Sequence, residues 1–218
     1  MGQYYKPVVL NQDWKENEKP VAASLLCYDF GNGAKLMEHS YVGNNFVNAA
    51  IEMIKIVGGG KAVPFVWVGD YADPVETKNH PVKLDKDGYI DGGGIDIFEC
   101  ACDFIYKDGG SSDDKTKEYK ELLQKVMSSD PKGCRYIVNE TKREFVKVPK
   151  LSHKRYQIHP LPILCSSGNG RGGGDYGYYE SKNNDVVGRW AYDEIRITDE
   201  DPEPLGYKHC GWRFECER

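Results

Sequence analysis

The feature that most constrains the fold is a helical pattern followed at once by a short apolar run. Across residues 42–57, apolar side chains recur at steps of three and four, and Gly58-Gly59-Gly60 ends the pattern, which predicts an amphipathic helix. Residues 63–68 are almost wholly apolar, which is typical of a buried central strand. The chain is therefore expected to pack a helix against a sheet.

Strand patterns outnumber helical patterns in the rest of the chain. A second helix is predicted over residues 114–127, where polar capping residues precede an apolar face and Asp130-Pro131 follows it. The other strand signals lie at residues 4–10, 21–28, 95–98, 104–106, 135–139, 144–148, 156–164 and 186–197. We expect one α+β domain over residues 1–218, with a mixed or mainly antiparallel sheet and two main helices.

Composition excludes several classes of protein. The net charge is −5 and no basic face is evident, so no nucleic-acid partner is expected. No apolar run approaches the ~20 residues that cross a bilayer, and the first residues do not resemble a signal peptide. The seven cysteines are an odd number without a paired C-x-x-C, which indicates free thiols and no metal site. The protein is therefore expected in the cytoplasm, away from membranes.

A glycine-rich segment, Cys165-Ser166-Ser167-Gly168-Asn169-Gly170-Arg171-Gly172-Gly173-Gly174-Asp175-Tyr176, has the composition of a binding loop. Glycines allow close approach of a partner and can turn several N–H groups toward an anion. Arg171 supplies a cation and Asp175 a carboxylate that can orient it. The segment predicts a small-molecule binding protein that holds a phosphate-bearing ligand, with a nucleotide as the leading choice. No cofactor is identified.

Three further residues are candidates for the same site. Asp70 and Asp73 follow the predicted strand 63–68, and the carboxyl ends of strands are where sites gather in sheets covered by helices. His159 precedes the glycine-rich segment. The candidate ligand-binding residues are therefore Asn169, Gly170, Arg171, Gly172, Gly173, Gly174, Asp175, Asp70, Asp73 and His159.

The acidic residues and the histidine leave a second hypothesis open, an enzyme that acts on a phosphate-bearing ligand with acid/base groups from this set. Local roles are the alternative for each residue: Asp70 capping a turn, Asp73 preceding Pro74, and His159 hydrogen-bonded in the structure.

Cys165 and Arg171 have the C-x5-R spacing of the protein tyrosine phosphatase loop. That chemistry also uses a helix that begins at the loop and lowers the thiol pKa. Glycines follow Arg171 here, and they are poor helix formers. We therefore expect Cys165 to be a buried, inert thiol.

Several short segments resemble a family of bacterial and phage proteins that begin with MGQYY. They are Met1-Gly2-Gln3-Tyr4-Tyr5-Lys6, Gly69-Asp70-Tyr71-Ala72-Asp73, residues 169–175 and Val187-Gly188-Arg189-Trp190-Ala191. The order of these segments differs from that in the family. The resemblance implies no activity, but it centres the shared motif on Arg171 and Asp175. It leaves a third hypothesis open, a phage-encoded interaction protein that acts on a host factor, in which Arg171 pairs with Asp175 structurally.

Overall fold

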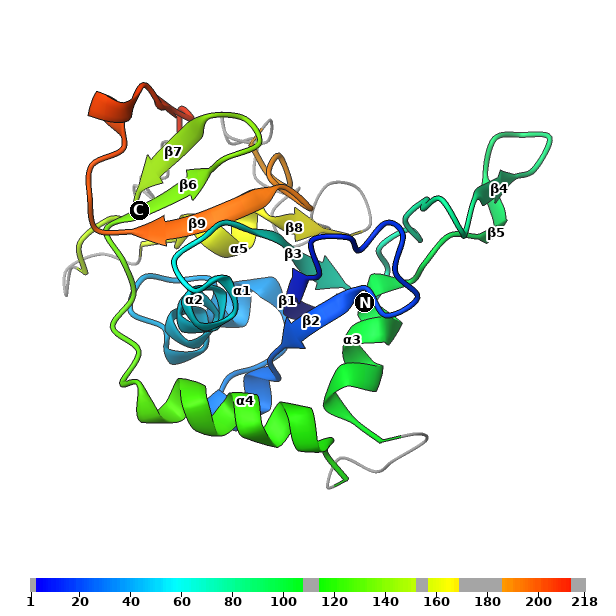
Figure 1. Cartoon of the computed structure of the whole chain (residues 1–218), viewed down its shortest axis with the longest axis horizontal. Coiled ribbons are helices and arrows are strands. Elements are labelled where there is room, and N and C mark those ends of the chain that lie inside the picture. The colour runs from blue at the N-terminus through cyan, green and yellow to red at the C-terminus, as the bar shows by residue number, and fades with distance from the viewer. Residues whose placement is uncertain (1–2, 108–113, 152–156, 169–185, 213–218) are drawn as a thin grey trace.

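The computed structural model describes residues 3–107, 114–151, 157–168 and 186–212. Within these residues the chain forms a mixed sheet of eight strands in the order β10-β7-β6-β9-β3-β1-β2, with β8 paired to β3, and a separate β4–β5 hairpin (Figure 1). The strands are β1 (Tyr5–Leu10), β2 (Val21–Ser24), β3 (Val63–Gly69), β4 (Val82–Leu84), β5 (Ile90–Gly93), β6 (Tyr136–Asn139), β7 (Glu144–Lys147), β8 (Ser166–Ser167), β9 (Glu194–Thr198) and β10 (Lys208–His209). Only the β10–β7 and β3–β8 pairs are parallel. The predicted α+β fold with a mainly antiparallel sheet is confirmed.

Helices cover both faces of the central strands (Figure 1). They are α1 (Leu36–His39), α2 (Asn45–Gly58), α3 (Ile97–Ile105), α4 (Lys117–Ser128) and α5 (Pro160–Leu164), with short 3-10 turns η1 (Cys27–Phe30) and η2 (Glu203–Leu205). On one face, odd-numbered side chains of β1 and β3 share the large core with α2; they are Tyr5, Val9, Val63, Phe65 and Trp67. On the other face, even-numbered side chains pack with α3; they are Val8, Leu10, Val66 and Val68. Strand alternation therefore decides which helix each side chain meets.

The two predicted helices are confirmed, with boundaries set by their caps. The side chain of Asn44 accepts hydrogen bonds from the N–H groups of Phe46 (2.8 Å) and Val47 (3.1 Å), and α2 ends before Gly59, whose φ is +54°. Glycine adopts this left-handed conformation without a steric penalty. Thr116 caps α4 by accepting from the N–H of Tyr119 (3.1 Å).

Three strand predictions are wrong because short helices occupy most of those residues. Residues 95–98 and 104–106 were expected as strands, but the side chain of Asp96 caps α3, and Ile97, Ala101 and Ile105 are buried at four-residue steps. The periodicity becomes visible only when both segments are taken as one helix. Residues 156–164 were expected as an irregular strand, but Pro160 begins α5, at a position that proline tolerates.

The late strand predicted over residues 186–197 is shorter than expected. Strand β9 begins only at Glu194 and inserts between β3 and β6. The preceding residues form turns: the N–H of Gly188 donates to Ile163 O and that of Trp190 donates to Leu164 O. Trp190 is fully buried, so this apolar stretch packs in the core as a turn.

Candidate functional site

Strand β8 fixes where the glycine-rich segment begins. Ser166 and Ser167 pair in parallel with Trp67 and Val68, near the carboxyl end of β3. The N–H of Trp67 also donates to Cys165 O at 2.8 Å. Gly168 is the last residue of the segment that the structure describes. The predicted ligand-binding residues Asn169, Gly170, Arg171, Gly172, Gly173, Gly174 and Asp175 lie outside the described residues.

Gly168 packs closely against two side chains from the start of the chain. A Cβ added at Gly168 would lie 2.7 Å from Tyr5 Oη and even nearer to Gln3 Oε1. Gly69, at the end of β3, has the same neighbours, since a Cβ there would lie 3.0 Å from the Tyr5 ring. Glycine is therefore needed at Gly168 for the backbone to approach Gln3 and Tyr5.

Gln3 carries a buried donor that lacks a partner. The residue is only 6% exposed, and its Oε1 accepts a hydrogen bond from Tyr5 Oη. Its Nε2 is fully buried and has no hydrogen-bond partner in the part of the chain that the structure describes. Leaving such a donor unpaired costs about 1–3 kcal/mol. Buried polar groups are nearly always paired, so the amide marks a place where an acceptor is wanted.

The two predicted aspartates lie at this end of the sheet but differ in their roles. Asp70 Oδ1 accepts from Tyr4 N at 3.0 Å, and Asp70 N donates to Tyr4 O at 3.0 Å, so Asp70 clamps the chain just before β1. Asp73 is exposed. Burial raises the pKa of Tyr192, and the charges of Asp96 and Asp73 raise it further. Tyr192 Oη in turn donates to Ser167 Oγ at 3.2 Å, which joins Tyr192 to β8.

His159 lies at the start of α5 and is buried. Its Nδ1 accepts from the N–H of Leu161 at 3.2 Å, so the imidazole is the N-cap of the helix. Burial lowers the pKa of His159 to about 3. The ring is therefore uncharged at neutral pH. The hydrogen bond that it accepts matches the structural role given above as the alternative for His159.

Cys165 is fully buried at the end of α5. Burial raises the pKa of its thiol well above the ordinary value. Because the thiolate is the nucleophile in cysteine chemistry, this environment disfavours attack by Cys165.

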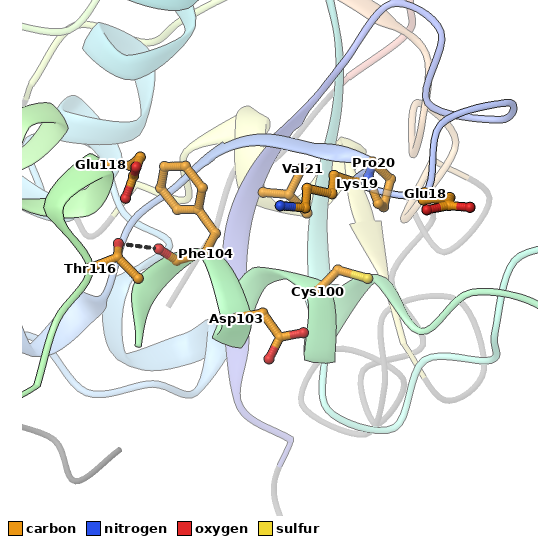
Figure 2. A pocket seen from close by; sticks show the side chains of 9 residues that line it. All are labelled: Glu18, Lys19, Pro20, Val21, Cys100, Asp103, Phe104, Thr116 and Glu118. Carbon is orange, nitrogen blue, oxygen red and sulfur yellow. Dashed lines mark hydrogen bonds between the residues drawn. The ribbon is translucent and has the colours of Figure 1, made fainter. Parts of the chain in front are cut away.

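A cavity of about 640 Å³ lies elsewhere, where the start of β2 faces α3 and the beginning of α4. Figure 2 shows its lining: Glu18, Lys19, Pro20, Val21, Cys100, Asp103, Phe104, Thr116 and Glu118. Thr116 Oγ1 donates to Phe104 O at 2.6 Å, which joins the two helices beside it. Three carboxylates and one amine line the cavity. Val21 pairs with Leu10 and Gly69 pairs with Tyr5, so the cavity and the glycine-rich segment lie toward opposite ends of β1.

The sequence pointed to the carboxyl end of β3 but missed the side chains that line it. The sequence did not predict Gln3, Tyr5 or Tyr192 as site residues. One available signal was alternation, which puts Gln3 on the same face of its strand as Tyr5, so that a polar side chain enters a buried row. Tyr192 comes from a turn that no local pattern places beside Ser167.

No family model, no curated protein and no solved structure matches the chain. Among the described residues, no helix combines the length and the apolar character that crossing a membrane requires.

Proposed function

We propose that the protein binds a small molecule that carries a phosphate group, with a nucleotide as the first choice, at the carboxyl end of β3. The observation that carries the proposal is the buried Nε2 of Gln3 beside Gly168, which has no hydrogen-bond partner among the described residues. An amide nitrogen is a donor only, and phosphate oxygens are acceptors only. A phosphate oxygen at this position would satisfy the donor and recover its desolvation penalty.

The sequence that follows Gly168 supports the same ligand. Residues 169–175 contain four glycines and Arg171. The N–H groups of glycines can surround an anion, and the guanidinium of Arg171 can contact two phosphate oxygens at once. Gln3, from the beginning of the chain, would complete the donor set.

Binding is favoured over catalysis by the roles of the acid/base candidates. Asp70 accepts a hydrogen bond from the backbone of Tyr4, and His159 accepts one from the backbone of Leu161. Burial holds His159 neutral and Cys165 protonated. Of the described candidates, Asp73 alone is solvent-exposed, and one exposed carboxylate is a weak basis for acid/base chemistry.

The cavity beside α3 is less suited to a phosphate. Its lining carries three carboxylates, from Glu18, Asp103 and Glu118, against the single amine of Lys19. Like charges repel, so an anion entering this cavity would meet an unfavourable field. Its volume is in the range typical of ligand pockets, but its charge is of the wrong sign.

Titration calorimetry with ATP, GMP and inorganic phosphate tests the proposal. Arg171→Lys keeps the charge but loses the planar fork, so we expect the Kd of the bound nucleotide to rise about ten- to a hundred-fold. Arg135→Lys is the matched control because Arg135 is exposed and lies just before β6. That variant should bind like the parent protein.

Thermal melts supply the contrary outcome. If Arg171 pairs with Asp175 as a structural ion pair, Arg171→Ala and Asp175→Ala should each cost about 3 kcal/mol or more, because each strands a buried charge. Large destabilisation by both changes, with no nucleotide or phosphate raising the Tm of the parent protein, would overturn the binding proposal.

A further inference from the structure

Lys6, in the middle of the sheet, has a buried amine whose nearest partner is a thiol. The residue is 8% exposed and lies on the face of β1 that α3 covers. Its Nζ is 3.3 Å from Cys102 Sγ and 3.2 Å from the centre of the Phe98 ring. Within the described ranges, no carboxylate lies within ion-pairing distance of this amine. Buried lysines are usually paired with an acid, so the arrangement is unusual.

The surroundings favour the uncharged forms of both groups. Burial lowers the pKa of Lys6, against smaller opposing effects of Cys102 and Glu99. Burial also raises the pKa of Cys102, while the nearby Lys6 lowers it. The neutral amine is therefore a larger fraction of Lys6 than of an exposed lysine at the same pH. The neutral amine has a free lone pair and is the nucleophilic form of lysine.

We propose that Lys6 and Cys102 form a covalent Nζ–O–Sγ bridge when the protein meets hydrogen peroxide. The first peroxide molecule oxidises the thiol by two electrons to a sulfenic acid and leaves as water. The second accepts two more electrons as the N–O bond forms. One oxygen atom stays in the bridge, and the other three leave as water with the S–H hydrogen, one N–H hydrogen and the four hydrogens of the peroxide.

The geometry favours an oxygen bridge over a direct S–N bond. The two atoms already lie 3.3 Å apart, and an inserted oxygen lets them remain farther from each other than a direct bond would. Cys102 is only half-buried, so a small oxidant can reach its sulfur. The bridge would join β1, in the centre of the sheet, to helix α3 across the smaller core.

Cys100 provides a matched control on the same helix. It is also a half-buried free thiol, and it lines the cavity near the start of β2. Burial raises the pKa of the Cys100 thiol to about 11, and burial is also the largest cause of the raised pKa of Cys102. They differ in that Lys6 donates its hydrogen bond to Cys102.

The experiment treats the full chain with a small excess of hydrogen peroxide and measures it by peptide-mapping mass spectrometry. We expect a cross-linked pair of peptides that contains Lys6 and Cys102 and is heavier than the separate peptides by one oxygen less two hydrogens, about 14 Da. Dithiothreitol should reverse the change. Cys100→Ser should keep the cross-link and Cys102→Ser should abolish it.

Other products would overturn the proposal. A loss of two hydrogens would mean a sulfenamide or a disulfide, and a gain of two or three oxygens on Cys102 without a cross-link would mean simple over-oxidation. A bridge that persists in Cys102→Ser would assign the chemistry to another thiol. Lys6→Arg, which keeps the charge, should leave Cys102 to oxidise without cross-linking; if that variant does not fold, the mass and location of the product in the parent protein decide the question.

Discussion

At one end of β1, Gln3 and Tyr5 are buried and Gln3 Nε2 has no hydrogen-bond partner among the described residues, whereas at the other end, beside Leu10, the surface opens into a cavity lined by carboxylates. The cavity offers about 640 Å³ of space, but its charged groups have access to water. The Gln3 amide nitrogen has lost water without gaining a partner in the described residues. The contrast teaches that an unmet desolvation cost can mark a binding site better than empty space does.

The largest expected effect separates two buried amides. Asn139 Nδ2 donates to Asp193 Oδ2 at 2.7 Å, and its Oδ1 accepts from the N–H of Lys142 at 2.8 Å. Asn139→Leu removes both hydrogen bonds, one of them to a charged carboxylate that still contacts Lys142 Nζ, and should lower the free energy of unfolding by about 3 kcal/mol. Gln3→Leu removes a donor that has no partner among the described residues and one hydrogen bond, from Tyr5 Oη, so the ligand-free protein should lose only about 1 kcal/mol. Urea denaturation of the two variants measures the difference, and equal losses would show that Gln3 is satisfied.

The second expected effect is a loss of stability at acid pH caused by the buried His159. Burial lowers the folded-state pKa of His159 to about 3, below its ordinary value of 6.5, so unfolding takes up a proton. The contribution of the neutral ring to the free energy of unfolding is complete above about pH 6.5 and is lost progressively as the pH falls toward 3. Between pH 7 and pH 5 the loss should be about 2 kcal/mol.

His159→Asn isolates this contribution, since asparagine also caps helices but does not titrate. Urea denaturation at pH 7 and pH 5 should show a smaller acid-side loss in this variant than in the parent protein. His80→Asn, which replaces an exposed histidine, is the control. An unchanged acid-side loss in His159→Asn would show that His159 does not drive it.

A third effect concerns the ligand. If Gln3 Nε2 contacts a phosphate oxygen, Gln3→Leu should weaken nucleotide binding about tenfold, the equivalent of one hydrogen bond to a charged group. Calorimetry on the folded variant measures this directly. Nucleotide binding that is unaffected by Gln3→Leu would separate the amide from the ligand.

The smallest effect is expected at the cavity. Asp103→Asn and Glu118→Gln remove lining charge at the opposite end of β1, so nucleotide affinity should change less than about twofold at physiological ionic strength, where screening is strong. A tenfold gain in affinity in either variant would instead place the anion in the cavity and reverse the contrast between the two ends.

The sequence correctly predicted the elements whose pattern of apolar residues has only one interpretation. Helix α2 has a long apolar face with a glycine end, and β3 is apolar throughout, so local pattern decides both. Helix α3 was not predicted because its nine residues make little more than two turns, and its flanking Asp and Gly residues resemble a loop. Pro160 suggested a broken strand, although proline also begins helices.

The site was predicted only in part for a different reason. Asp70 and Asp73 were proposed from the rule that sites gather at the carboxyl ends of strands. The contact of Gly168 with Gln3 joins residues far apart in the sequence, and it exists only because β8 and β1 flank the same strand β3. Strand neighbours of this kind are set by topology, which no local pattern encodes.

The position of β9 has a consequence for how the chain reaches this fold. Strands β1, β2 and β3 can pair with one another, and β6 can pair with β7, but the two groups meet only through β9. The sheet therefore stays in two halves until residues 194–198 have left the ribosome. Contacts between residues so distant in the sequence slow folding. Until β9 arrives, the facing edges of β3 and β6 are open to any other strand, and the interval before closure is when the nascent chain is most exposed to aggregation.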